Sequence, residues 1–266
     1  MSKTIFNDDL SYIRHPNSDA RFSYKILEDE IKALIDRKLG NANAPLADKS
    51  CCKTFVLAAY KTNLANLPHR LRTYRTPISN PSTCTIWEAS RATTAAPTFF
   101  DPITIEKPGE AKITFVDPGI ARCNNPSLQA LQEARDIWGP QTQFQCFISI
   151  GTGGVSIAKL KDHESIFGRM FKRADTYLKL AYALKEIATD CKATHENMER
   201  VPDLEDVYSR FNVETGLDSV GLEEANKEEE ISTFTNMYLE DRRVVKMRRN
   251  CAKLLLGNNS LGEYQH

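Results

Sequence analysis

The sequence predicts an α/β protein, a β-sheet with flanking helices, followed by a mainly helical C-terminal segment. Two observations support this fold class. Strand and helix signals alternate as far as about residue 155, which is typical of a sheet with helices on its faces. Beyond that point most of the pattern is helical. We therefore expect two domains, residues 1–155 and residues 156–266, with the second packed on the first.

Two helices are predicted in the N-terminal part of the chain. Apolar residues recur at helical spacing in residues 23–39, and Gly40 supplies a C-terminal cap. Residues 86–96 also carry a helical pattern, which Pro97 ends because proline cannot continue a helix. These helices are candidates for the layers that flank the sheet.

Short apolar runs around these helices predict strands. The run at residues 53–60 (KTFVLAAY) and the run at residues 143–150 (QFQCFISI) suit buried strands, since they are apolar without strict alternation. Shorter strands are expected at residues 71–74 and 111–116. Together these segments predict the sheet of the first domain.

The C-terminal segment contains two long helical patterns, at residues 166–193 and 231–256. One strand candidate, residues 208–213, lies between them. The acidic run 223–230 is interpreted as a solvated loop or helix start, and the basic run 242–249 as the solvent-facing side of a helix. Neither charge run predicts a binding site.

The composition narrows the function classes. Lys plus Arg and Asp plus Glu both number 35, so no overall charge draws the chain to nucleic acid. Seven cysteines, without the Cys/His spacing of a metal site, predict reduced thiols. The first residues form no signal peptide, and no run reaches the roughly 20 apolar residues of a transmembrane segment. We therefore expect a cytoplasmic protein.

Asp117 is the candidate functional residue. It follows the strand predicted at residues 111–116 and precedes a helix predicted at residues 127–138, whose cap is Asn124 or Asn125. Loops at strand ends carry catalytic groups in α/β enzymes, so this position suits a catalytic carboxylate. The same position also suits a turn-forming aspartate, because Asp-Pro sequences favour turns.

Three other features are interpreted as structural. The glycine-rich run 151–154 lacks the lysine and the spacing of a phosphate-binding loop, so it predicts a turn at a strand end. Cys123 has no histidine near it in sequence and is expected to be an ordinary packed or surface thiol. Arg91, inside a predicted helix, is expected to pair with a carboxylate or with backbone carbonyls.

Four sequence blocks occur in an order that one family shares. They are residues 52–58 leading to Tyr74-Arg75, residues 85–100 (TIWEASRATTAAPTFF), residues 115–126 (FVDPGIARCNNP) and residues 148–153 (ISIGTG). They resemble the second half of a patatin-like phospholipase domain, particularly its fungal forms. Residues 208–227 also resemble the segment that follows this domain.

The resemblance implies a fold, an activity and a partner. The fold would be an incomplete patatin-like three-layer sheet with flanking helices. The activity would be hydrolysis of a lipid acyl ester, without calcium, another metal or a cofactor. The partner would be that ester or a membrane-surface lipid, and the protein would then be peripheral to membranes.

The family's catalytic dyad is matched only in part. Its serine lies in a Gly-x-Ser-x-Gly elbow behind a glycine-rich loop that supplies N–H groups to the oxyanion. Its aspartate, the proton acceptor, lies in an Asp-Gly-Gly or Asp-Gly-Ala motif, which corresponds here to Asp117, Pro118 and Gly119. Pro118 departs from the motif: it lacks an N–H and favours extended backbone at Asp117.

No serine of the chain lies between glycines at the elbow spacing. We therefore expect a chain of lipid acyl hydrolase lineage that is inactive by itself. The alternatives are a catalytically dead or truncated paralogue that binds lipid or protein without turnover, and a fragment of a longer gene product in which the elbow precedes residue 1.

Overall fold

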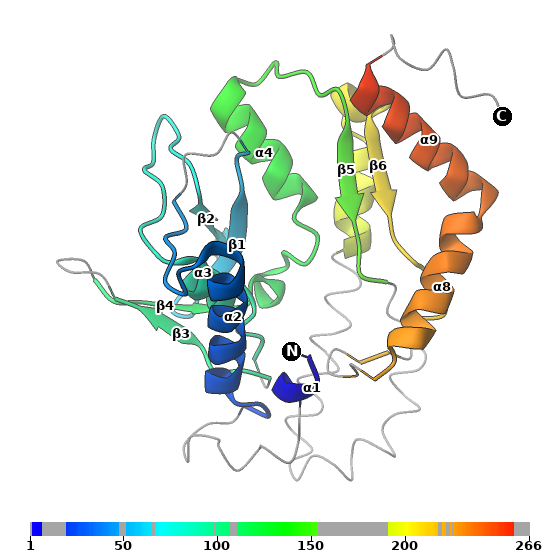
Figure 1. Ribbon diagram of the computed structural model, residues 1–266. Coiled ribbons are helices and arrows are strands. Elements are labelled where there is room, and N and C mark those ends of the chain that lie inside the picture. The colour runs from blue at the N-terminus through cyan, green and yellow to red at the C-terminus, as the bar shows by residue number, and fades with distance from the viewer. Residues whose placement is uncertain are drawn as a thin grey trace. The chain divides into compact units, whose positions relative to one another are not determined.

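The computed structural model shows helices and strands in both halves of the chain, which confirms the predicted α/β class (Figure 1). The chain divides into two compact units, Met1–Asn124 and Asn125–His266. The predicted domain boundary at residue 155 stays a prediction, since that residue lies outside the described part. The structure describes residues 2–6, 20–47, 52–64, 67–97, 99–106, 111–153, 191–217, 220–221, 224 and 226–257.

The first unit contains a four-stranded sheet in the order β2-β1-β4-β3, and each neighbouring pair is antiparallel. Strands β1 (Phe55–Tyr60) and β4 (Ile113–Val116) lie within the predicted runs. Strand β2 (His69–Arg72) begins two residues before its predicted position. Strand β3 (Ile103–Ile105) was not predicted, because three residues are too few for a periodic signal.

Helices of the first unit are α1 (Ser2–Ile5), α2 (Tyr24–Leu39) and α3 (Ile86–Thr93). As predicted, α2 ends at Gly40, whose left-handed backbone (φ 69°) glycine adopts without steric cost. Helix α3 ends three residues before the predicted residue 96, so the helix stops before Pro97 rather than at it. The first turn of α3 carries a reciprocal cap between its residues Thr85 and Glu88.

Helix α3 packs against β1, β3 and β4, and α2 packs against α3. Ala89 and Ala92, which lie one turn apart on α3, are buried in one apolar cluster with Ala58 of β1 and Phe115 of β4. Small side chains on both surfaces let the helix lie close to the strands. This core fixes the end of β4, which carries Asp117.

Arg91 is fully buried on α3, with 0% of its surface exposed. Its Nε lies 3.4 Å from Glu28 Oε1 on α2, and its Nη2 donates to the Asp101 carbonyl at 2.9 Å. Burial lowers the pKa of the guanidinium, and the neighbouring Glu28 carboxylate opposes that shift. The structure thus agrees with the predicted pairing of Arg91 with a carboxylate and a carbonyl.

In the second unit, α4 (Ser127–Trp138) has the predicted bounds. Strands β5 (Phe147–Ile150) and β6 (Tyr208–Phe211) form a parallel pair. The prediction that residues 143–150 form a buried strand is wrong in length and in burial, since Ile148 is 40% and Ile150 78% exposed. Among the described strands, β5 has only β6 as a hydrogen-bonding neighbour.

The last two helices are α8 (Glu228–Glu240) and α9 (Arg242–Leu256). The prediction of one helix over residues 231–256 is therefore wrong. Asp241 breaks it with an extended backbone (ψ 133°) and caps α9, since its Oδ1 accepts from the Arg243 N–H at 2.8 Å. Within the predicted helix at 166–193, only residues 191–193 lie in the described part, and they are helical.

Among the described helices, none combines the length and the apolar character that crossing a bilayer requires.

Candidate functional site

Asp117 lies directly after β4 and begins the short 3-10 helix η2 (Pro118–Ala121). Its backbone is extended (φ −53°, ψ 131°), as expected for a residue that precedes proline. Its N–H donates to the carbonyl of Ala95, just beyond α3, at 3.0 Å. The strand, α3 and η2 therefore hold the backbone of this aspartate together.

The carboxylate of Asp117 folds back over the turn. Its Oδ1 accepts from the Gly119 N–H at 2.7 Å, which is the bond of an Asx turn. Its other oxygen, Oδ2, has no hydrogen bond to any of the described residues. The two predicted interpretations are thus compatible: one oxygen forms the turn, and the other is available for proton transfer.

Gly119 allows this geometry because it has no side chain. A Cβ atom there would lie 2.8 Å from Asp117 Oδ1 and 2.7 Å from Asn124 Oδ1, closer than carbon and oxygen can approach. Asn124 Nδ2 donates to the Gly119 carbonyl at 3.2 Å, and so does the Arg122 N–H at 3.1 Å. A side chain at Gly119 would therefore displace the Asp117 carboxylate or the Asn124 amide from the turn.

Asn124 braces this turn and does not cap α4. The residue at the cap position is Pro126. Of the two predicted caps, Asn125 is the one that contacts the helix, because its Oδ1 accepts from the Ser127 N–H at 3.2 Å.

Burial raises the pKa of the Asp117 carboxyl above its ordinary value, and the Gly119 N–H partly opposes the shift. A carboxylate with a raised pKa holds a proton more tightly and is a stronger base. These are the properties that proton transfer from a hydroxyl group requires.

The raised pKa predicts a pH-dependent effect of Asp117→Asn on stability. The folded protein holds the Asp117 proton more tightly than the unfolded chain, so ionisation lowers the free energy of unfolding as pH rises from about 4 through the raised pKa. Asparagine keeps an acceptor for the Gly119 N–H without the charge. In urea unfolding, Asp117→Asn is expected to be more stable than wild type at neutral pH, and the gain should vanish below about pH 4.

Asp241→Asn is a control of opposite sign. Hydrogen bonds from the Arg243 and Val244 N–H groups hold the pKa of Asp241 below its usual value. Its ionised form therefore stabilises the fold above about pH 4, and asparagine should be less stable at neutral pH only. A gain for Asp117→Asn that is equal at both pH values would contradict the predicted burial of charge.

The other sequence candidates have structural surroundings. The Gly151 N–H donates to the Phe211 carbonyl at 2.8 Å, and the Gly153 N–H donates to Asn212 Oδ1 at 3.0 Å. Residues 151–153 follow β5 and bond to the segment that ends β6, but they adopt no turn, and residue 154 lies outside the described part. The Cys123 N–H donates to the Pro118 carbonyl at 3.2 Å. In the described ranges, no three His, Cys, Asp or Glu residues are grouped as metal ligands would be.

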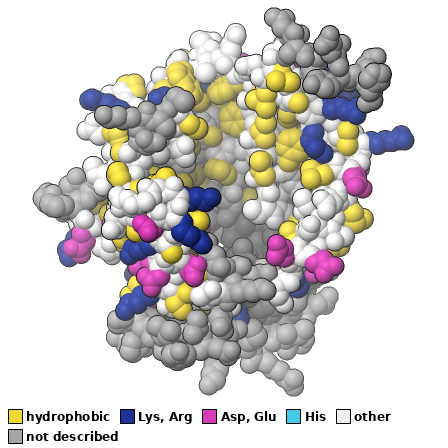
Figure 2. All heavy atoms as spheres, in the orientation of Figure 1, with side chains coloured by type: hydrophobic (Ala, Val, Ile, Leu, Met, Phe, Trp, Pro, Cys, Tyr) yellow, Lys and Arg dark blue, Asp and Glu magenta, His cyan; other side chains and the backbone are white. Residues whose placement is uncertain are grey.

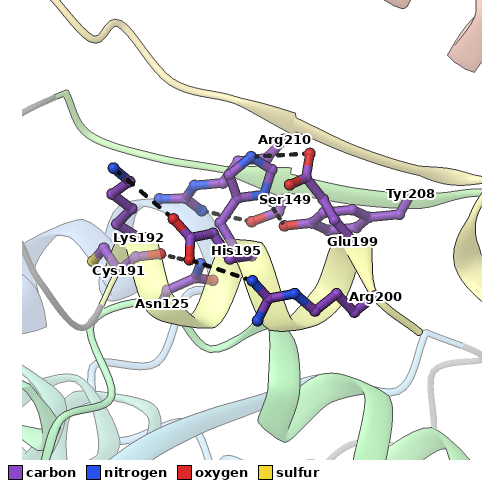
Figure 3. Close-up of polar contacts among 10 residues, drawn as sticks. Asn125, Ser149, Cys191, Lys192, His195, Glu199, Arg200, Tyr208 and Arg210 are labelled. Carbon is purple, nitrogen blue, oxygen red and sulfur yellow. Dashed lines mark hydrogen bonds and ion pairs between the residues drawn. The ribbon is translucent and has the colours of Figure 1, made fainter.

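A second polar cluster, in the Asn125–His266 unit, was not predicted. Figure 3 shows side chains from β5, β6 and the helix at residues 191–199 that point toward one another. Arg210 Nη1 donates to Ser149 Oγ at 2.6 Å, and Ser127 Oγ donates to the same oxygen at 2.8 Å. The Tyr208 hydroxyl lies 3.0 Å from His195 Nδ1. Burial raises the pKa of Tyr208, and its contact with Ser149 opposes that shift.

A cavity of about 320 Å³ borders this cluster. Its lining combines two carboxylates, Glu199 and Glu205, with the cation of Arg210 and the imidazole of His195. The lining therefore favours no single ligand charge. No sequence signal brings these side chains together, because they come from segments far apart in the chain.

The structure thus places one half-buried aspartate, fixed by a turn, at the end of a strand of an α/β fold. No protein-family model matches the chain. Relatives are found among phospholipases. "Phospholipase A I" of Arabidopsis thaliana is 30% identical over 129 residues, which is 48% of this chain and 8% of the relative.

Two further relatives cover more of the chain. "Calcium-independent phospholipase A2-gamma" of Rattus norvegicus is 30% identical over 175 residues, and "Patatin-like phospholipase 1" of Plasmodium falciparum is 30% identical over 183. Each alignment covers 64% of this chain, but only 20% and 26% of the two relatives. The chain thus spans about a quarter or less of the relatives it matches. These similarities support a patatin-like family and a lipid acyl hydrolase lineage.

Proposed function

We propose that the chain contributes the aspartate of a Ser-Asp dyad to a patatin-like lipid acyl hydrolase of the fungal type. Asp117 is the proton acceptor, and Pro118 and Gly119 form the turn that orients it. The observation that carries this proposal is the half-buried carboxylate with Oδ1 fixed by the Gly119 N–H at 2.7 Å. The names of the relatives supply the substrate class, a fatty-acyl ester of a phospholipid or related lipid.

The proposed chemistry needs one proton acceptor at Asp117. As a serine hydroxyl attacks the ester carbonyl, its proton passes to the carboxylate, and the protonated acid then donates it to the leaving alcohol. A water molecule then attacks the acyl-serine ester and gives its proton to the Asp117 carboxylate. The acyl group leaves as a free acid, and the serine hydroxyl regains its proton from Asp117. No metal or cofactor takes part, and the enzyme would work at the cytoplasmic surface of membranes.

The 266 residues contain no Gly-x-Ser-x-Gly sequence, and in the described part no serine hydrogen-bonds to Asp117. The chain by itself is therefore expected not to hydrolyse a p-nitrophenyl acyl ester above the rate of Asp117→Ala. Release of p-nitrophenolate, followed by absorbance, measures this. Hydrolysis that disappears in Asp117→Ala would show that another nucleophile serves the aspartate, and the proposed division of the dyad would be wrong.

The alternative is a paralogue that binds lipid or protein without turnover. The genomic sequence upstream of Met1 distinguishes the two readings. An in-frame glycine-rich loop and a Gly-x-Ser-x-Gly elbow would support the complete hydrolase, and Asp117→Asn in that longer product should then abolish ester cleavage. An upstream region interrupted by stop codons would favour the binding paralogue.

A further inference from the structure

Helix α9 carries a row of cations along one side. Arg242, Lys246, Arg249 and Lys253 follow one another at intervals of four, three and four residues, so they lie on the same face of the helix. All four are exposed, and none of their side chains has a hydrogen bond or an ion pair with any described residue. These four residues are called the cation stripe below.

The opposite face of α9 anchors the helix to its own unit. Val244 and Cys251 are buried, and Met247 and Leu254 are half-buried at the same helical spacing. Helix α9 contacts β6, and Gln145 Nε2 donates to the Leu254 carbonyl at 2.6 Å. The cation stripe therefore faces away from the core of its own unit, on a helix that is held in place.

The cation stripe costs stability in the free protein. Like charges three or four residues apart on a helix repel one another, and α9 contains no acidic residue that would offset them. The other cations of α9 differ: Arg243 Nε lies 3.4 Å from Asp241 Oδ1, and Arg248 donates to the Leu239 carbonyl. A surface that concentrates negative charge would relieve this repulsion.

Exposed apolar side chains follow the cation stripe. Leu256 lies three residues beyond Lys253 on the same face and is 59% exposed. Leu255, about a quarter of a turn further round the end of the helix, is 63% exposed. In Figure 2, dark blue side chains lie over the region of α9 in Figure 1. A basic helix face that ends in exposed leucines offers both charge and apolar surface to an anionic membrane.

We propose that α9 docks the protein on an anionic lipid surface, with the cation stripe at the headgroups and Leu255 and Leu256 at the acyl boundary. Nucleic acid would satisfy the cations, but its phosphate backbone offers no apolar layer to the leucines. The inference deepens the proposed function, on which it rests for the choice of a lipid partner. It adds a way for the protein to reach a substrate that lies in a membrane.

Sedimentation with vesicles tests the docking. Wild-type protein is expected to bind phosphatidylcholine vesicles that contain phosphatidylserine, and to bind pure phosphatidylcholine weakly. Binding should weaken between about 0.1 M and about 1 M salt, because the screening length falls from about 10 Å to about 3 Å. Neutralising the cation stripe should lower the partition coefficient on the order of a thousandfold, since each cation near the surface contributes about 1 kcal/mol. The variant carries Arg242→Gln, Lys246→Gln, Arg249→Gln and Lys253→Gln.

A matched control removes the same net charge elsewhere. It replaces four exposed cations of the first unit and should bind as wild type does. A third variant, Leu255→Ser with Leu256→Ser, should weaken binding without changing its salt dependence. Circular dichroism checks that every variant is folded. The control substitutions are Lys25→Gln, Arg37→Gln, Lys38→Gln and Lys61→Gln.

Three outcomes would overturn the docking proposal. They are equal binding to both kinds of vesicle, equal loss in the stripe and control variants, and binding to duplex RNA without binding to vesicles. Sedimentation requires no ester cleavage. If the chain bound vesicles but the longer product cleaved esters equally well with Asp117→Asn, the proposed function would be refuted and the docking proposal would stand.

Discussion

Arg91→Ala is expected to lower the free energy of unfolding of its unit by about 3–5 kcal/mol. The substitution leaves the largely buried Glu28 carboxylate without its cation and the Asp101 carbonyl without its donor, and it opens a cavity at a fully buried position. Urea unfolding followed by the fluorescence of Trp87, which lies on the same helix, measures the loss.

Two controls show whether the unpaired charge causes the loss. A double variant, Arg91→Met with Glu28→Met, should recover much of the stability, because replacing a buried ion pair by apolar groups is often neutral. Lys112→Ala removes a cation whose pair with Glu106 is exposed and should leave the urea midpoint unchanged. If Arg91→Ala lowered the free energy of unfolding by less than about 1 kcal/mol, the prediction would be wrong, because exposed ion pairs contribute as much.

Ser149→Ala is expected to destabilise the second unit by about 2 kcal/mol. Ser149 is buried, and its oxygen accepts from the Arg210 guanidinium at 2.6 Å and from Ser127 Oγ at 2.8 Å. Alanine leaves both donors without that acceptor, and a half-buried cation loses more than a neutral group does. Guanidinium unfolding followed by circular dichroism measures the change.

Ser209→Ala is the matched control on the neighbouring strand. Ser209 pairs with Ile148 in the β5–β6 register and is 8% exposed, close to the 6% of Ser149. In the described part of the chain its hydroxyl has no hydrogen bond, so its loss should change stability by no more than about 0.5 kcal/mol. Equal losses in the two variants would mean that the bonds to Ser149 contribute nothing.

Periodicity predicted the elements with long, regular patterns. Helices α2 and α4 and strand β1 were found because their apolar residues recur over many positions. The break at Asp241 was missed because the helical pattern continues on both of its sides, and only the backbone angle separates α8 from α9. The exposure of Ile148 was also missed, since an apolar run looks the same whether or not another layer covers it.

The candidate site was also predictable only in part. The position of Asp117 after a strand, and the blocks around it, could be found in the sequence. The contact of Gly119 with Asn124, and the donor that occupies Oδ1, depend on three-dimensional geometry. The cation stripe was visible as a basic run, but its interpretation needed the burial of the opposite face and the absence of ion pairs among the described residues. A zero net charge does not reveal a local concentration of cations.

The exposed side of β5 has a practical consequence. In the described sheet, β6 is the sole hydrogen-bonding neighbour of β5, so the strand combines an open edge with the exposed isoleucines Ile148 and Ile150. Open, apolar strand edges recruit further strands, and copies of one chain can supply them. Concentrating this polypeptide for crystallisation therefore favours edge-to-edge aggregation, and a lysine on β5 is the simplest way to keep it in solution.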